Sequence, residues 1–190
     1  SDKLFIAANN IVGKKKCIFS IVRYGNVVGS RGSVMEIFKN LSKNKNNIYP
    51  LTDRAMTRFW VTLEETVEFV LLSLLRMQGG EIFVPKIDSI FIKDLVPAFN
   101  SKAKIKIIGI RPGEKIHEIL CSKEDSESTI EFENFYTIKP QIKFTTTKTN
   151  YFLTPLGEKG KKVTSGSEYN SFNNPSFLSV NELKRLVKEY

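Results

Sequence analysis

The feature that most constrains the fold is a short apolar run, Cys17 to Val22, set between a helical pattern and a glycine-rich loop. Residues 1–11 repeat apolar side chains every three or four positions, which predicts a helix. The run itself is rich in Ile, Val and Phe, which predicts a strand buried on both faces. Three glycines lie in the loop from Tyr24 to Gly32 that follows. This order of helix, strand and loop is typical of a doubly wound α/β sheet, in which ligands bind at the carboxyl ends of the strands.

The chain beyond this loop alternates helical and strand patterns up to about residue 121. Helices are predicted over 34–41, 62–77, 92–99, 113–120 and 180–187, and strands over 48–51, 59–61, 81–84 and 105–110. Residues 130–143 carry weaker strand signals. Residues 145–177 are rich in Thr, Ser, Asn, Gly and Lys, which predicts an irregular segment.

The charge of the chain narrows the class of ligand. The net charge is +9, but the lysines are scattered, and the one run of three, Lys14 to Lys16, is explained by a solvated turn. Nucleic-acid binders cluster their basic residues on one face or one segment. We therefore do not expect nucleic acid as a partner, and a small polyanion such as a diphosphate fits the charge better.

Cysteine, histidine and hydropathy patterns exclude further classes. Two cysteines, Cys17 and Cys121, give neither a disulfide framework nor the spacing of a metal site, and a single histidine, His117, excludes a histidine-based metal cluster. We expect no metal site and a reducing, cytoplasmic setting. The longest apolar run, Phe69 to Leu75, is far shorter than the roughly 20 residues that cross a bilayer, so no membrane partner is expected.

The glycine-rich loop is the first segment suited to ligand binding. Glycines let the backbone approach a ligand closely, and exposed amides can hold phosphate oxygens. Asn26 adds a donor and an acceptor. A plain turn between a strand and a helix explains the glycines equally well.

Two further segments carry arginines in a promising setting. Arg58 stands beside the one tryptophan, Trp60, where a guanidinium can fork onto a phosphate or stack on a uracil-like ring. An ion pair with Asp53 is the alternative. Arg111 and Glu114 flank a Pro-Gly turn and can hold a diphosphate and a ribose hydroxyl together. His117, three residues after Glu114, we interpret as structural.

Five strings of sequence closely resemble the inverting UDP-N-acetylglucosamine 4,6-dehydratases, which are extended short-chain dehydrogenases/reductases. The strings are Ser1–Phe5, Arg23–Val34, Met56–Trp60, Gly79–Lys86 and Ile107–Lys115. They occur in the same order as in that family, over residues 1–140. The remaining residues resemble the family only loosely.

The resemblance implies an α/β fold with two parts. These are the C-terminal part of a Rossmann-type doubly wound parallel sheet and a smaller mixed α/β substrate-binding region. Residues 1–32 would be the last part of the Rossmann-type domain, and residues 33–140 the substrate-binding region interleaved with the remaining sheet elements. Residues 141–190 would be an irregular C-terminal tail with a final helix.

The resemblance also implies a reaction. Such enzymes use bound NADP to oxidise C4 of a UDP-linked N-acetylglucosamine, abstract the C5 proton and expel the C6 hydroxyl as water. The hydride then returns to C6, and C5 is reprotonated on the opposite face. The product is a 4-keto-6-deoxy sugar nucleotide that feeds pseudaminic acid and related surface or flagellar glycans. The protein orients the substrate and moves protons, while the cofactor carries the hydride.

Site residues carry over from the family position by position. Those expected to line the junction of the cofactor and the nucleotide sugar are Val27, Val28, Gly29, Ser30 and Arg31. Those expected to contact the UDP-sugar substrate are Asn26, Arg58, Arg111 and Glu114.

No catalytic residue is expected within this chain. In the family the Tyr-x-x-x-Lys pair, the acid/base residues and the glycine fingerprint lie upstream of the string that begins at Ser1, and this sequence holds no G-x-G-x-x-G after a strand. We therefore expect the C-terminal part of an enzyme, inactive alone, with the missing N-terminal half as its partner. Relatives of this kind often associate, which allows a homo-oligomer.

Two groups of alternatives stay open. The first is a retaining nucleotide-sugar 4,6-dehydratase or a 4-epimerase of the same superfamily, because the stereochemical outcome depends mostly on the part outside this chain. The second is a non-catalytic module that binds a nucleotide sugar or nucleic acid.

Overall fold

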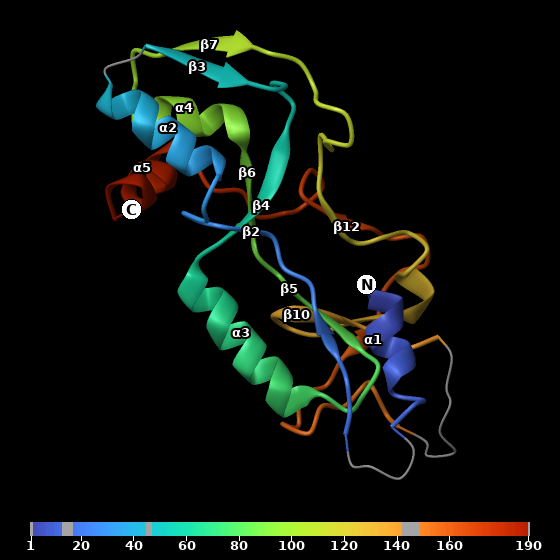
Figure 1. Cartoon of the computed structure of the whole chain (residues 1–190). Helices are drawn as coiled ribbons and strands as arrows, with labels where there is room; N and C mark the ends of the chain where they lie inside the picture. Colours follow the sequence, from blue (N-terminus) through green and yellow to red (C-terminus); the bar gives the residue numbers. More distant parts are fainter. Residues whose placement is uncertain (1, 13–16, 45–46, 142–148, 190) are drawn as a thin grey trace. The chain divides into compact units, whose positions relative to one another are not determined.

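The structure is a computed structural model that describes residues 2–12, 17–44, 47–141 and 149–189 (Figure 1). The chain groups into two compact units, each assembled from three separate stretches. Unit 1 comprises residues 1–24, 64–86 and 120–169, and unit 2 comprises residues 25–63, 87–119 and 170–190. The division expected from the sequence used contiguous ranges, because periodicity cannot show which distant stretches pack together. The run Lys14 to Lys16 lies outside the described residues.

Unit 1 contains a five-stranded mixed sheet in the order β1-β5-β10-β9-β11. β1 (Ile21–Val22) runs parallel to β5 (Ile82–Pro85), and the later strands β10 (Phe135–Ile138), β9 (Thr129–Glu131) and β11 (Lys161–Lys162) are joined by antiparallel pairing. The helix α1 (Asp2–Ala8) and the short 3-10 helix η1 (Ser126–Ser128) belong to the same unit. A hydrophobic core cluster of this unit is formed by Phe83, Ile130, Phe132 and Phe135.

The first strand is shorter and less buried than the sequence predicts. Strand pairing is limited to Ile21 and Val22, which are half-buried, and Cys17 and Ile18 are exposed. The prediction of a strand buried on both faces over 17–22 is therefore wrong. Its physical reason lies in the strand order, since β1 is at the edge of the described sheet and has β5 as its neighbour on one side.

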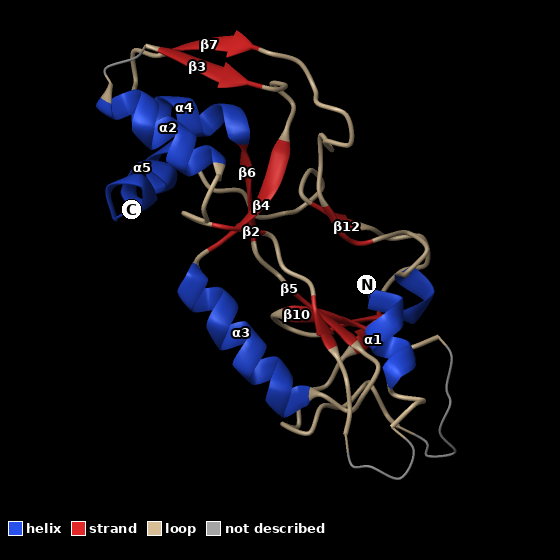
Figure 2. Ribbon diagram, in the orientation of Figure 1, coloured by secondary structure: helices blue, strands red, loops and turns tan. Residues whose placement is uncertain are grey.

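Unit 2 is built on two small sheets. In one, β2 (Asn26–Val27) runs parallel to β4 (Thr57–Val61), and β6 (Asp88–Phe91) pairs with β4 in the antiparallel sense. In the other, β3 (Ile48–Leu51) and β7 (Lys104–Ile107) form a parallel pair. The helices α2 (Val34–Lys43) and α4 (Ile92–Phe99) lie against one face of that pair, and α5 (Val180–Glu189) packs on α4 (Figure 2).

The core of unit 2 lies between α2, α4 and the β3–β7 pair. Phe38 of α2 meets Tyr49 of β3 edge-to-face, with ring centroids 5.0 Å apart. Leu95 of α4 and Leu183 of α5 are fully buried in the same cluster. These contacts explain why α4 continues through Pro97, because its buried residues hold the helix although proline removes a backbone donor. The mixed α/β class predicted from the sequence is confirmed.

The helix predicted over 113–120 is wrong. The segment is a turn followed by extended chain that ends in β8 (Ile119–Cys121). Gly113 has a φ of 79°, which lies outside the helical region. The carbonyl of Ile116 accepts hydrogen bonds from the Thr57 amide and the Arg58 side chain, at 3.0 Å in each case. In a helix, the carbonyl of Ile116 would accept a hydrogen bond from the amide four residues later. Here groups on β4 donate to that carbonyl instead.

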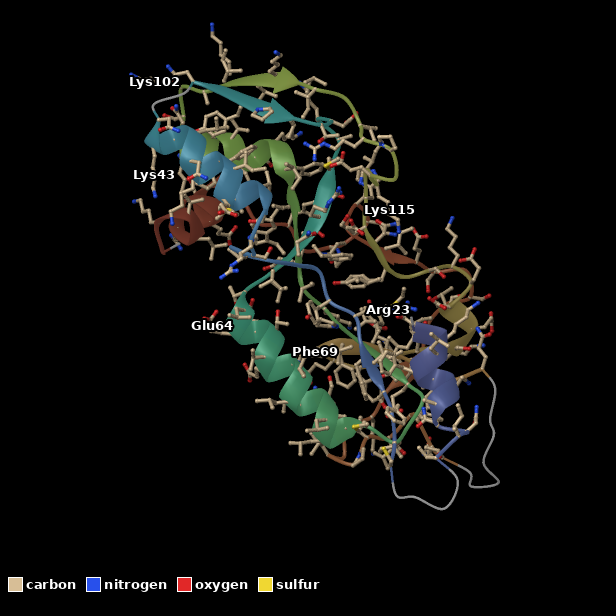
Figure 3. All side chains as sticks on the ribbon, in the orientation of Figure 1. Arg23, Lys43, Glu64, Phe69, Lys102 and Lys115 are labelled. Carbon is tan, nitrogen blue, oxygen red and sulfur yellow. The ribbon has the colours of Figure 1, made fainter. Side chains whose placement is uncertain are left out.

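The helix α3 (Leu63–Arg76), on which Figure 3 labels Glu64 and Phe69, exposes a row of apolar side chains. Its buried residues are Thr66, Ser73 and Arg76. Five apolar side chains spaced three or four positions apart are each 41–64% exposed: Val67, Val70, Leu71, Leu74 and Leu75. This set of five is called the α3 apolar face below. Since such spacing puts side chains on one side of a helix, the face is continuous and has no cover among the described residues.

None of the helices in the described ranges is both long enough and apolar enough to cross a membrane. Apart from the final helix α5, the later part of the chain is mostly loop. From residue 149 onward it contains two strands of two residues each, β11 and β12 (Tyr169–Asn170).

Candidate functional site

A cavity of about 420 Å³ lies in unit 2, and all of its lining residues belong to that unit. Its floor is apolar and includes the buried side chains of Phe38, Leu51, Met56 and Trp60. Its polar lining residues are Asn26, Ser30, Arg31, Ser33, Thr52, Arg58, Arg111 and Glu114. An apolar floor with a few converging polar groups, within a volume of about 300–1,000 Å³, is typical of a small-ligand site.

Asn26 owes its position to the glycine before it. β2 pairs with β4 so that Asn26 stands opposite Trp60. A Cβ placed on Gly25 would lie 2.4 Å from Cβ of Phe59, so no larger residue fits unless β2 moves away from β4. The close approach of the two strands therefore requires Gly25, and it sets the exposed Asn26 at the wall of the cavity.

The five residues expected at the cofactor junction divide into two groups. Val27, Ser30 and Arg31 line the cavity. Val28 instead packs against the core of unit 2, and its amide donates to the carbonyl of Val61. Gly29 does not line the cavity. The structure thus brings three of the five to the cavity wall.

Arg58 lies on β4 and its side chain is only 11% exposed. Its Nη1 donates to the carbonyl oxygens of Thr57 (2.7 Å) and Ile116 (3.0 Å). Its Nη2 donates to the carbonyl oxygen of Lys115 at 2.7 Å. The guanidinium therefore ties β4 to residues 115–116 while it also lines the cavity. Figure 3 labels Lys115 in this segment.

The charge of Arg58 is balanced by carboxylates. Its Nε lies 3.6 Å from Oε1 of Glu118. Burial lowers the pKa of the Arg58 guanidinium, and the nearby carboxylates of Glu118 and Glu114 oppose that lowering. The ion pair with Asp53 considered from the sequence is not formed among the described contacts, where the Asp53 carboxylate accepts from the Ala55 amide at 2.7 Å.

Arg111 and Glu114 lie in the exposed segment that follows β7. The Glu114 carboxylate accepts from the Arg111 amide (3.2 Å) and from the Thr52 hydroxyl (3.4 Å). Gly113 between them takes its positive φ of 79° in this turn, a conformation that glycine adopts readily. To the described residues, the Arg111 guanidinium makes no hydrogen bond or ion pair, so its donors face no competing protein acceptor there.

Two buried polar atoms in the lining have no hydrogen-bond partner in the described part of the chain. They are Nε1 of Trp60 and Oγ of Ser33. Ser33 precedes α2 but makes no side-chain capping bond. Because a buried polar group without a partner is destabilising, both atoms are candidates for a bond to a ligand or a water.

Sequence reasoning missed several residues of this site. Thr52 lines the cavity but carries no motif of its own, and Met56, which also lines it, belongs to the string Met56–Trp60 but is not among the site residues expected from the sequence. Thr57 and Ser171 bond to each other through their hydroxyls at 2.7 Å, although 114 positions separate them. No local pattern predicts that contact, since Ser171 lies in the segment that reads as irregular.

Unit 1 contains a second cavity, of about 300 Å³, lined by Cys121, Tyr136 and Tyr169 among others. Burial raises the pKa of the Cys121 thiol to about 12, so that thiol stays protonated and is a poor nucleophile. No group of three or more His, Cys, Asp or Glu side chains that could hold a metal ion occurs among the described residues.

Comparison with known proteins gives consistent matches. The family model described as "Polysaccharide biosynthesis protein" matches residues 1–140. A UDP-N-acetylglucosamine 4,6-dehydratase (inverting) from Campylobacter jejuni is 53% identical over 187 residues, which is 98% of this chain and 56% of the relative. A UDP-glucose 4-epimerase from Rickettsia bellii is 36% identical, over 98% of this chain and 54% of its own length.

Among solved structures, the X-ray structure of Pen from Bacillus thuringiensis is similar to this chain with a TM-score of 0.81 and 28% sequence identity. The likeness covers 99% of this chain and 54% of that one. The chain thus spans about half the length of the curated relatives it matches. The match over residues 1–140, well over half of the 190, shows that this chain belongs to the polysaccharide biosynthesis protein family.

Proposed function

We propose that this chain forms the nucleotide-sugar-binding part of an NADP-dependent UDP-N-acetylglucosamine 4,6-dehydratase that inverts C5. The observation that carries the proposal is the cavity in unit 2, around which Asn26, Arg58, Arg111 and Glu114 converge. The 53% identity to the Campylobacter jejuni dehydratase supports the same substrate. The product would be a 4-keto-6-deoxy sugar nucleotide for pseudaminic acid or a related surface glycan.

Each polar group has a role in holding UDP. Arg111, with its uncommitted guanidinium, binds the diphosphate, because a planar fork of N–H donors matches phosphate oxygens. Glu114 exchanges its weak bond from Thr52 for one from a ribose hydroxyl. Arg58 has given three of its five N–H groups to backbone carbonyls, and its Nε faces the Glu118 carboxylate, which leaves one N–H of Nη2 for the ligand. The apolar floor receives the uracil ring.

The residues present fit the edge of a nicotinamide cofactor. Val27, Ser30 and Arg31 line the same cavity, so a cofactor would meet the nucleotide sugar at this wall. When bound, NADP would supply the hydride acceptor for oxidation at C4. The contribution of this chain is to hold the sugar nucleotide in register with that acceptor and to keep the diphosphate from water, while the catalytic acid and base lie outside the residues named here.

The proposal includes partners and a location. The remaining part of the enzyme completes the cofactor site, and copies of the enzyme associate with one another. A reducing cytoplasm suits the two cysteines, which are both free thiols in the structure.

Replacement of Arg111 tests the binding role directly. A charged hydrogen bond is worth about 1.5–3 kcal/mol, so Arg111→Ala should weaken UDP binding roughly ten- to a hundredfold. Arg111→Lys should recover only part of the loss, since an ammonium cannot reproduce the planar fork. Trp60 is the one tryptophan and lines the cavity, so its fluorescence can report the titration of the 190-residue chain with UDP.

Lys106→Ala is the matched control, because it removes one exposed positive charge that does not line the cavity. Equal UDP affinity in Arg111→Ala and Lys106→Ala would show that Arg111 is a surface charge and no ligand contact. In the complete enzyme, the Arg111→Ala loss should fall on KM more than on kcat, because the diphosphate stays in place through the reaction.

A 4-epimerase is the second candidate, favoured by the 36% identity to the Rickettsia bellii enzyme. Deuterium incorporation separates the two. In D₂O, a 4,6-dehydratase exchanges the C5 hydrogen and loses the C6 hydroxyl, whereas a 4-epimerase leaves both in place. The configuration at C5 of the product then distinguishes an inverting from a retaining dehydratase.

A further inference from the structure

A chain of side-chain hydrogen bonds runs behind the cavity through three residues of unit 2. Oγ1 of Thr57 lies 2.8 Å from Nδ1 of His117 and 2.7 Å from Oγ of Ser171. Thr57 and Ser171 are fully buried. The imidazole of His117 is half-buried and packs on the ring of Phe172, with centroids 4.7 Å apart. We call Thr57, His117 and Ser171 the hydroxyl–histidine chain.

The hydroxyl–histidine chain holds residues 116–118 from both sides. On one side, the Thr57 amide donates to the carbonyl of Ile116 at 3.0 Å. On the other, the Ser171 amide donates to the carbonyl of Glu118 at 2.8 Å, and the Glu118 amide donates to Oγ of Ser171 at 2.9 Å. Residues 116–118 are therefore pinned to β4 and to residue 171 by backbone and side chain together.

The donors and acceptors of the hydroxyl–histidine chain can all be matched. With Nδ1 of His117 as acceptor, the Thr57 hydroxyl donates to it and accepts from the Ser171 hydroxyl, which in turn accepts from the Glu118 amide. Each hydroxyl then donates once and accepts at least once, which leaves no buried group unpaired. Removal of one member leaves another buried hydroxyl without its partner.

The segment that carries Arg111 and Glu114 depends on this anchor. Upstream, the Ile108 amide donates to the carbonyl of Leu51 at 2.9 Å, where the segment leaves β7. Residues 109–113 are exposed. Downstream, Glu114 accepts from the Thr52 hydroxyl at 3.4 Å, and the fixed points that follow are the carbonyls of residues 115 and 116 and the hydroxyl–histidine chain behind them. The position of Arg111 over the cavity is thus set by fixed points on either side.

We propose that Thr57, His117 and Ser171 are positioning residues for the diphosphate grip: they fix residues 116–118 and thereby hold Arg111 over the cavity, while Glu114 has its own hydrogen bond from Thr52. The inference rests on the proposed function, because it assigns the grip to UDP. A nucleophilic role for Thr57 or Ser171 is excluded by their complete burial. His117 does not line the cavity, so it acts through Arg111 and does not touch the ligand.

The test measures the phosphate-dependent part of the affinity. In the 190-residue chain, UDP and uridine are each titrated against Trp60 fluorescence in the wild type, His117→Phe and His117→Asn. Phenylalanine keeps the ring contact with Phe172 but lacks Nδ1, while asparagine restores a polar group near that position. His117→Phe should weaken UDP binding about tenfold and uridine binding less than twofold, and His117→Asn should recover most of the loss.

A double-mutant cycle with Arg111→Ala shows whether the effect passes through Arg111. If it does, His117→Phe adds almost nothing once Arg111 is alanine. Thr57→Val and its control Thr57→Ser repeat the comparison from the other end of the bond, in case His117→Phe perturbs folding. Equal weakening of UDP and uridine, or full additivity with Arg111→Ala, would overturn the proposal.

The proposed function and this inference fail in different ways. If the wild type binds UDP and Arg111→Ala weakens it, but His117→Phe and Thr57→Val leave it unchanged, the inference alone is wrong. If the wild type shows no UDP binding, both are overturned.

Discussion

Among the residues that the structure describes, Arg76 pairs with one carboxylate, that of Glu158. Its Nε and Nη2 donate to the two Glu158 oxygens at 2.8 and 2.7 Å, and its guanidinium lies 4.4 Å from the centroid of the Phe135 ring. The Arg76 side chain is only 9% exposed. Loss of the carboxylate would therefore leave a largely buried positive charge without a partner, which is destabilising. The pair also fastens the irregular segment around residue 158 to α3.

This pair predicts an acid-sensitive part of the stability. The hydrogen bonds from Arg76 lower the pKa of Glu158 below its ordinary value of 4.5. A lowered pKa means that the stabilisation is complete at neutral pH and is lost as the pH falls below 4.5 and through the folded-state pKa. At pH 7, Glu158→Gln should reduce the free energy of unfolding by about 1–2 kcal/mol. The gap between wild type and Glu158→Gln should narrow as the pH falls below 4.5, when thermal melts are compared between pH 7 and acid pH.

Glu127→Gln serves as the control for the pH series. Glu127 pairs with Lys162 at 2.8 Å, but both side chains are more than half exposed. Exposed pairs contribute little to stability, so this substitution should leave the melting temperature almost unchanged. A pH-independent difference between wild type and Glu158→Gln would show that the ion pair is not the source of the effect.

At the scale of elements, the α3 apolar face is the feature with the clearest physical consequence. Apolar area removed from water is worth about 25 cal/mol per Å², so two such faces gain by meeting. We predict that the 190-residue chain associates as its concentration rises and binds the dye ANS. Leu71→Gln combined with Leu75→Gln should reduce both, because glutamine keeps helix propensity while it removes the apolar surface.

Sedimentation velocity over a concentration series measures this association. Lys104→Gln with Lys106→Gln is the matched control, since these exposed positions lie on β7 and not on α3. A wild-type chain that stays monomeric and melts in one sharp transition would contradict the prediction.

The elements also show how far local sequence determines structure here. β3 and α4 have the bounds that the sequence predicts, because their apolar periodicity agrees with the core they enter. Residues 113–120 depart from prediction because groups remote in sequence, Thr57 and Arg58, take the backbone carbonyl of Ile116. β1 departs because burial depends on neighbours beyond its own sequence.

The residues of the candidate site also differ in how far the sequence reveals them. Asn26, Arg58, Arg111 and Glu114 stand out in the sequence because each sits in a distinctive string, and all four line one cavity. Ser171 gives no such signal, because its importance arises from one hydroxyl contact with Thr57 across 114 positions. The residues proposed to touch a ligand are thus easier to find from sequence than the residues proposed to hold them in place.

For the whole molecule, we expect binding of UDP and binding of the dinucleotide cofactor to be separable. The lining of the cavity proposed for UDP lies within unit 2, whereas the sequence lacks the glycine fingerprint that binds a dinucleotide pyrophosphate. We predict that the 190-residue chain binds UDP but neither retains NADP nor converts UDP-N-acetylglucosamine. Chromatography of nucleotide released from the purified chain and NMR of the sugar nucleotide after incubation measure the two properties. Stoichiometric NADP, or any turnover proportional to the amount of chain, would contradict the account.

The outward-facing leucines and valines of α3 also bear on the lifetime of the chain in a cell. Quality-control chaperones hold exposed apolar surface, and proteases remove chains that stay partly open. For a copy whose α3 apolar face is uncovered, three processes therefore compete: capture by chaperones, degradation by proteases, and docking onto the surface that covers the helix. Its steady-state abundance would then follow the supply of that covering surface more closely than its own rate of synthesis.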